Sequence, residues 1–249
     1  NQGYLNQAAL SAGFTVTGTA KGAETGQSVL MTVTDASQAV VLSNLSGTVN
    51  SRGEFSVALT PQVLQSLADG SYRLQAQVSD RAGNAAVAQN LSFQVDQTAP
   101  SAPQSVALDA VSDSGVSAHD NITNQGSHLQ WTGQTVRADA GSQVLLYDKG
   151  QLLAGVSARV DAAGGFHFEE VSLSQGTHLL TARVQDAAGN LGEALSLAPV
   201  TVDSQAPLVN RVTVPGAAVY DRGQVLTFVL QGSEVMNVTG APRLGIGLD

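Results

Sequence analysis

Residues 69–100 read DGSYRLQAQVSDRAGNAAVAQNLSFQVDQTAP, and residues 175–207 read QGTHLLTARVQDAAGNLGEALSLAPVTVDSQAP. The two stretches are copies of one ending, because Asp80 corresponds to Asp186 and Asn84 to Asn190, each 106 positions later. A repeat of about 100 residues has the size of one small β-sandwich domain. The duplication therefore predicts two consecutive domains of the same kind.

Apolar and polar residues alternate inside both copies. Every second position is apolar in two matching runs: Tyr72, Leu74, Ala76 and Val78 in the first copy, and Leu180, Ala182 and Val184 in the second. A period of two is typical of strands with one buried face. Each copy holds about seven such runs between Gly, Asn, Asp and Ser turns, which is typical of an antiparallel two-sheet sandwich. The expected fold class is all-β: tandem Ig-like antiparallel β-sandwiches in a linear rod, with a third sandwich incomplete.

The segments VDQTAP (95–100) and VDSQAP (202–207) mark the domain ends. Each closes a strand, and the proline that follows cannot donate to a β-ladder. We expect one Ig-like sandwich over 1–97, a second over 98–204, and the N-terminal part of a third over 205–249. The chain starts without Met and without a signal-peptide pattern, so we expect an interior part of a longer protein.

One segment has a helical pattern. In TPQVLQSLADG (60–70), Thr60 can cap a helical turn and Gly70 can end it. We expect one short helix there, on a crossover between the sheets.

Composition excludes several classes of function. Among 249 residues there are 20 acidic and 11 basic ones, giving a net charge of −9, which argues against a nucleic-acid partner. No apolar run reaches the roughly 18 residues that a membrane span needs, so no membrane insertion is expected. Cysteine is absent, which excludes disulfides, thiolate zinc sites and a cysteine nucleophile.

Catalytic patterns are missing as well, and we expect no enzyme. The sequence has no G-x-S-x-G, no phosphate-binding loop and no H-E-x-x-H. Adjacent Glu169 and Glu170 are expected to point to opposite faces of a strand, so they cannot act together as an acid/base pair. His167 alternates with phenylalanines and should face solvent. Trp131 shares a strand face with Leu129 and is expected in the core rather than on an exposed sugar platform.

Four motifs together resemble a known family: the D-x-A-G-N loop, the V-D-x-x-A-P junction, LDAVSDSGVSAHDNITN (108–124) and LNQAALSAGFTVTGTAKGAETGQSV (5–29). They resemble the tandem bacterial Ig-like domains of large type I-secreted repeat adhesins and biofilm-associated surface proteins. The resemblance implies an extracellular stalk on a bacterial cell surface, with Ca²⁺ stiffening the domain junctions. One departure is Ala9, where the family usually carries a carboxylate; Gly3 and Tyr4 also replace an acidic residue.

The placement of acidic residues gives a separate argument for Ca²⁺, which takes six to eight oxygen ligands. In an Ig-type sandwich the loop between the last two strands faces the previous domain. Three groups follow: Asp96, Asp186 and Asn190 at the first junction; Asp109, Asp113, Asp120 and Asp203 at the second; and Asp80 and Asn84 toward a preceding domain. The alternative for D-x-A-G-N is a plain turn, in which Asp accepts local backbone hydrogen bonds.

Three classes of function remain. The first is a non-catalytic, calcium-stiffened stalk segment of a surface adhesin, acting in cell adhesion or biofilm formation. Its partners are neighbouring Ig-like domains of the same chain and a host or biofilm surface ligand. The second is a glycan- or protein-binding Ig-like module, and the third an accessory β-sandwich of a secreted polysaccharide enzyme. Sugar sites usually depend on exposed aromatic rings, and only 4% of residues are aromatic, which favours the stalk.

Overall fold

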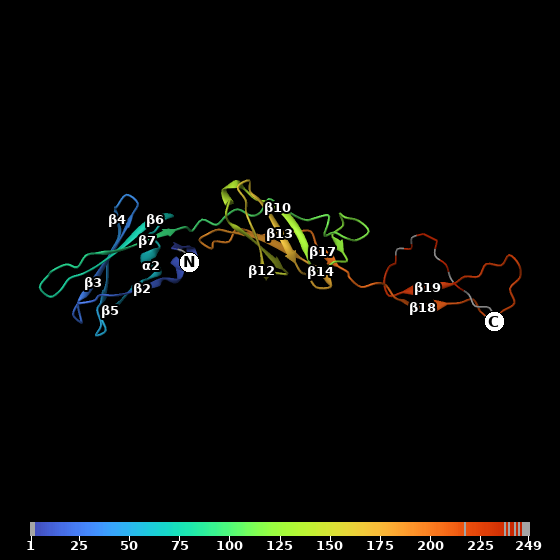
Figure 1. Ribbon diagram of the computed structural model, residues 1–249, viewed down its shortest axis with the longest axis horizontal. Coiled ribbons are helices and arrows are strands. Elements are labelled where there is room, and N and C mark those ends of the chain that lie inside the picture. The colour runs from blue at the N-terminus through green and yellow to red at the C-terminus, as the bar shows by residue number, and fades with distance from the viewer. Residues whose placement is uncertain are drawn as a thin grey trace.

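The structure is a computed structural model that describes residues 3–216 and 218–236, with 238, 240, 241, 243 and 245 beyond them. It is nearly all β, which confirms the expected fold class. Three parts follow one another along the long axis (Figure 1). We call residues 3–97 unit one and residues 98–204 unit two; the last part begins at residue 205.

Unit one contains seven strands and two short helices. In chain order they are β1 (Tyr4–Leu5), α1 (Gln7–Ala12), β2 (Phe14–Thr19), β3 (Ser28–Asp35), β4 (Val40–Thr48), β5 (Glu54–Leu59), α2 (Pro61–Leu64), β6 (Gly70–Val78) and β7 (Gln89–Val95). One sheet has the order β1-β7-β6-β3-β4, and the other consists of β2 and β5. β1 runs parallel to β7, while the other pairs are antiparallel.

Unit two repeats this plan with more strands. They are β8 (Ser105–Leu108), β9 (Ile122–Thr123), β10 (Leu129–Gln134), β11 (Gln143–Asp148), β12 (Gln151–Arg159), β13 (Gly165–Val171), β14 (Gly176–His178), β15 (Leu180–Gln185), β16 (Leu195–Ser196) and β17 (Val200–Val202), with a 3₁₀ turn, η1, at Arg137–Asp139. The sheets are β13-β10-β8, β12-β11-β15-β16 and β14-β17-β9. The last strand is split, since β16 pairs with β15 and β17 pairs with β14.

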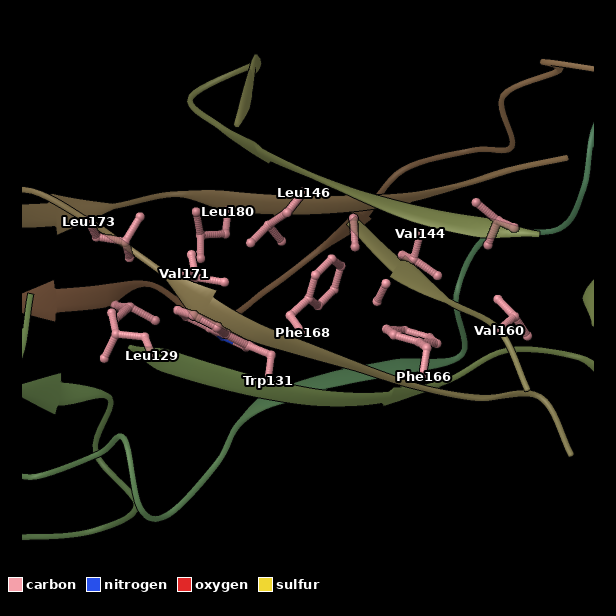
Figure 2. Packing of buried hydrophobic residues seen from close by; sticks show 14 of the residues in the cluster. Leu129, Trp131, Val144, Leu146, Val160, Phe166, Phe168, Val171, Leu173 and Leu180 are labelled. Atoms are coloured by element: carbon pink, nitrogen blue, oxygen red, sulfur yellow. The ribbon is translucent and has the colours of Figure 1, made fainter. Parts of the chain in front are cut away.

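The core of unit two lies between its sheets. Trp131 is 1% exposed and packs among aliphatic side chains of the facing sheet, so the core position predicted for it is confirmed (Figure 2). Phe166 and Phe168 meet edge to face, with ring centroids 5.8 Å apart. A ring of this size fits because the residue opposite Phe166 is Gly133, which has no side chain.

The helices differ from the expectation. α2 begins after Thr60 as predicted, but the Thr60 side chain makes no capping hydrogen bond. α2 ends at Leu64, well before Gly70, because the chain turns to bury Leu67. α1 is not predicted by the sequence; Asn6 caps it by accepting a hydrogen bond from Ala9 N at 2.9 Å. Neither described helix has the length or apolar character that a membrane span requires.

The described residues of the last part form one hairpin, β18 (Val209–Thr213) and β19 (Val229–Gly232). None of its described apolar residues is buried. The assignment of 205–249 as the beginning of a third sandwich stays a prediction.

Candidate calcium sites at the domain junctions

The first junction is held by the Asp186–Asn190 loop of unit two, the predicted D-x-A-G-N loop. Asn190 N donates to Asp186 Oδ1 at 2.8 Å, and its side-chain Nδ2 donates to Asp186 Oδ2 at 2.9 Å. The same Nδ2 reaches across the junction to the backbone oxygen of Asp96, at 2.8 Å. The structure therefore brings together the three residues that the sequence places at this junction, although their metal binding stays a prediction.

A second contact closes the same junction from the N-terminal segment of unit one. Asn6 Nδ2 donates to the backbone oxygen of Ala188 at 3.0 Å, and Ala188 is 4% exposed. Asn6 is thus both the cap of α1 and a bridge to unit two. Sequence reasoning missed this residue; the only signal for it is an Asn directly before a short Ala- and Leu-containing run, which is a helix-capping pattern.

Negative charge accumulates at this junction. Partial burial, followed by the nearby charges of Asp186 and Asp69, raises the pKa of Asp96, while a hydrogen bond from Thr98 N lowers it. The ionised form of Asp96 is therefore disfavoured in the folded chain. A cation between Asp96 and Asp186 would reverse that penalty.

The corresponding loop of unit one, Asp80–Asn84, has the same internal geometry. Asn84 N and Nδ2 donate to Asp80 Oδ1 and Oδ2, both at 2.8 Å, and these hydrogen bonds lower the pKa of Asp80. The loop is exposed and lies at the pole of unit one that is farthest from unit two (Figure 1). A plain turn accounts for all of these contacts. The loop of unit two differs in its two bonds to the neighbouring unit, from Asn190 Nδ2 to Asp96 O and from Asn6 Nδ2 to Ala188 O.

The far pole of unit two contains an unusual carboxylate. Asp113 is 4% exposed, and its Oδ2 accepts from Asn121 N at 3.0 Å. Its Oδ1 is buried and has no hydrogen-bond partner. A buried carboxylate oxygen without a partner is costly, because it has lost its hydration and gained nothing in return. Among the described residues, this buried Asp113 oxygen is the strongest indication of a cation site.

The other three carboxylates predicted at that pole have local partners. Asp109 Oδ2 lies 3.6 Å from His167 Nδ1, Asp120 Oδ1 accepts from Ile122 N at 3.1 Å, and Asp203 Oδ1 accepts from Gln175 Nε2 at 2.8 Å. The bond from Gln175, assisted by Gln205 N, lowers the pKa of Asp203. Among residues that the structure describes, no three His, Asp or Glu side chains converge closely enough to hold a metal. The expected gathering of four carboxylates is therefore not seen in this arrangement.

The donors present suit Ca²⁺ better than a transition metal. Carboxylate and carbonyl oxygens surround both poles, and Ca²⁺ prefers such hard ligands in flexible loops. Asp96 and Asp186 would hold it at the first junction, and Asp113 at the far pole of unit two. Buried His178 lies apart from these residues, with its ring nitrogens 2.8 Å from Asp148 Oδ2 and 2.9 Å from the backbone oxygen of Ser174.

The family profile named Bacterial Ig-like domain matches residues 14–97 and 99–204. Together these matches cover most of the chain, one within each unit. The chain therefore belongs to the bacterial Ig-like domain family.

Similar solved structures include a Ca²⁺-stabilised adhesin with which an Antarctic bacterium binds ice (22% identity, 85% of this chain and 49% of that chain, TM-score 0.39). A structure of a bacterial ice-binding adhesin described for host cell surface retention is also 22% identical, over 86% of this chain and 65% of that chain, with TM-score 0.38. Fibronectin(III)-like modules of Clostridium thermocellum CbhA are 15% identical, over 80% and 88%, with TM-score 0.45. The chain spans about half to two thirds of the two adhesin structures. The search of curated proteins found no match.

Proposed function

We propose that the chain is a non-catalytic stalk segment of a bacterial cell-surface adhesin, stiffened by Ca²⁺ at its domain junctions. Membership of the bacterial Ig-like family supports the stalk. The observation that carries the proposal is the first junction, where Asn190 bridges to Asp96 and a second carboxylate, Asp186, lies close enough to raise the Asp96 pKa. The stalk is extracellular and acts in cell adhesion or biofilm formation.

The stiffness has two sources. The hydrogen bonds of Asn6 and Asn190 limit rotation between the units without any ion. A cation shared by Asp96 and Asp186 adds a link across the junction and removes the repulsion between the two carboxylates. The neighbouring Ig-like units of the same chain are thus the first partners of each unit.

A second ion is proposed at the far pole of unit two. There Asp113 Oδ1 offers a buried, unpaired oxygen, and Asp109, Asp120 and Asp203 would complete the ligand set after their side chains turn from their present partners. Asp80 and Asn84 would serve the same purpose toward a module on the other side of unit one. Residues 205–249 would begin a third sandwich, and a host or biofilm surface ligand would bind elsewhere on the stalk. Affinity should lie in the extracellular range, on the order of 10⁻⁴–10⁻³ M.

Calorimetric titration of the whole chain with calcium tests the two sites separately. The wild type should show saturable heat; Asp96→Asn with Asp186→Asn should remove the first component, and Asp113→Asn the second. Asp161→Asn is a suitable control, since Asp161 accepts hydrogen bonds only within its own turn, from Ala163 N and Gly165 N, and makes no bond to Asp96, Asp186 or Asp113. Equal heats in the wild type and in both site variants would refute calcium binding at these positions.

A further inference from the structure

Unit one holds the first residues that follow its last strand. Gln97 N donates to Asp69 Oδ1 at 2.7 Å, and Thr98 Oγ1 donates to Asp69 Oδ2. Asp69 is the last residue of the loop between α2 and β6. The Gln97 side chain is anchored to the same loop, since its Nε2 donates to the backbone oxygen of buried Leu67 at 2.9 Å. Backbone and side-chain hydrogen bonds therefore attach the start of the linker to the body of unit one.

Unit two makes the same connection with a different side chain. Gln175 stands where unit one has Asp69, since each of them directly precedes the glycine that begins the next strand. Ser204 lies two residues after β17, just as Gln97 lies two residues after β7. Gln175 Oε1 accepts from Ser204 N and from Ser204 Oγ, both at 3.0 Å. The hydrogen bond from a linker amide to this loop side chain thus recurs at equivalent positions of both units.

The two acceptor side chains differ in charge. The bonds from Thr98 Oγ1 and Gln97 N lower the pKa of Asp69, so its carboxylate is ionised at neutral pH and accepts charge-assisted hydrogen bonds. Gln175 is neutral and uses both ends of its amide, because its Nε2 donates to Asp203 Oδ1 at 2.8 Å. The same linker amide is therefore bound by a charged acceptor in unit one and by a neutral acceptor in unit two.

The linker after unit one is also in close contact with unit two. A Cβ at Gly192, just beyond the Asp186–Asn190 loop, would lie 2.4 Å from the backbone oxygen of Pro100 and 3.0 Å from that of Ser101. The equivalent residue of unit one, 106 positions earlier, is Ala86, which has a Cβ. The close approach of linker and loop at the first junction therefore requires a glycine.

We propose that Asp69 and Gln175 are exit clamps, each of which fixes the direction in which the chain leaves its own unit. An exit clamp consists of protein atoms only, so it acts without an ion. At the first junction, Ala99 is the one residue between Thr98, which Asp69 holds, and Pro100, which lies against Gly192. A fixed exit direction serves the proposed stalk function, on which this inference rests.

Residue-resolved hydrogen exchange of the whole chain in chelator tests the clamp of unit one. Asp69→Ala should speed exchange of the Gln97 amide about tenfold, because the amide loses its acceptor. The same variant should broaden the distribution of distances between spin labels on the two units. Asp69→Gln introduces the side chain that unit two uses and should restore most of the protection. Wild-type exchange of the β6 amides in both variants checks that unit one remains folded.

Asp35→Ala is the matched control. Asp35 also accepts hydrogen bonds from a backbone amide and a hydroxyl, those of Ser37 at 2.9 Å and 2.6 Å, and these bonds lower its pKa. They stay within one turn of unit one, so the variant should leave both the Gln97 exchange and the distances unchanged. Gln175→Ala should speed exchange of the Ser204 amide and leave that of Gln97 at the wild-type rate.

Three results would overturn the inference. The first is wild-type exchange of the Gln97 amide in Asp69→Ala. The second is exchange in Asp69→Gln that is as fast as in Asp69→Ala, since the two side chains would then not be equivalent clamps. The third is a wild-type distance distribution in Asp69→Ala although the Gln97 amide exchanges faster. All these readings are taken in chelator, so the exit clamps and the proposed calcium sites can fail separately.

Discussion

Asp96 lies at the first junction, where its backbone oxygen accepts a hydrogen bond from Asn190 and the charge of Asp186 acts on its carboxylate. Its pKa is raised above the ordinary value of 3.8 by burial and by Asp186, so ionisation of Asp96 opposes folding. The cost is present above the folded-state pKa and disappears as the pH falls through it. Asp80 and Asp203 behave in the opposite way: their lowered pKa values stabilise the fold above 3.8, and that contribution is lost as the pH falls below it.

We therefore predict that Asp96→Asn raises the melting temperature at pH 7 in chelator, by about 1–3 °C after allowance for solvent screening. The gain should shrink as the pH falls through the raised pKa of Asp96, because wild-type Asp96 then becomes protonated. Asp80→Asn is the control and should lower the melting temperature at pH 7. Thermal unfolding followed by circular dichroism across this pH range measures both. A melting temperature of Asp96→Asn below that of the wild type in chelator would contradict the argument.

At the scale of elements, the repeated sequence predicted most strands and the junction loops, since alternation and turn residues act locally. It did not predict α1, because a six-residue helix without charge pairs has a weak pattern. It could not predict the bond from Asn6 to Ala188, since the partners are 182 residues apart and the acceptor is a backbone oxygen. The second cluster was expected from the placement of acidic residues between the first two strands of unit two, beside the end of its last strand. Sequence alone could not show the local partners that Asp109, Asp120 and Asp203 have in the structure.

The strand difference between the units leads to a prediction about two equivalent glycines, Gly18 opposite Phe55 and Gly133 opposite Phe166. A Cβ at Gly133 would overlap the Phe166 ring and lie 2.6 Å from Ser105 O of β8. For a Cβ at Gly18 the nearest atoms all belong to the Phe55 ring, and β5 is the one strand that pairs with β2 in the described part of unit one. Gly133→Ala should cost about 1–3 kcal/mol, and Gly18→Ala clearly less, because only the ring must move.

Calorimetric unfolding of the whole chain measures both glycine variants. Trp131 fluorescence follows unit two specifically, since it is the only tryptophan in the chain and is buried there. Equal losses of unfolding free energy in the two variants would show that the contact with β8 adds nothing to the cost of Gly133→Ala.

On the scale of the whole molecule, two small sandwiches behave as one body only if their junction is fixed. Asn6 and Asn190 link the units from both sides of the junction. Asn6 caps α1 in unit one, and Asn190 lies in the Asp186–Asn190 loop of unit two. Their acceptors across the junction are backbone oxygens, and the one carboxylate that loses a donor, Asp186, is only half-buried. The expected effect is on the motion between units rather than on the stability of either one.

Asn6→Ala with Asn190→Ala should therefore broaden the distribution of distances between labels placed on the two units, by double electron–electron resonance in chelator. The core of unit two should still unfold at nearly the wild-type temperature by Trp131 fluorescence. Gln7→Ala, which removes only an exposed bond within α1, is the control and should leave the distances unchanged. A double variant with a wild-type distance distribution would mean that these bonds do not fix the junction.

Small-angle X-ray scattering of the wild-type chain, with millimolar calcium and then with chelator, tests the central claim most directly. Asp96→Asn with Asp186→Asn is measured alongside. The account predicts a well-defined maximum dimension for the wild type in calcium, a broader and shorter distribution in chelator, and no calcium response at the first junction of the double variant. Wild-type profiles that coincide in calcium and in chelator would contradict it.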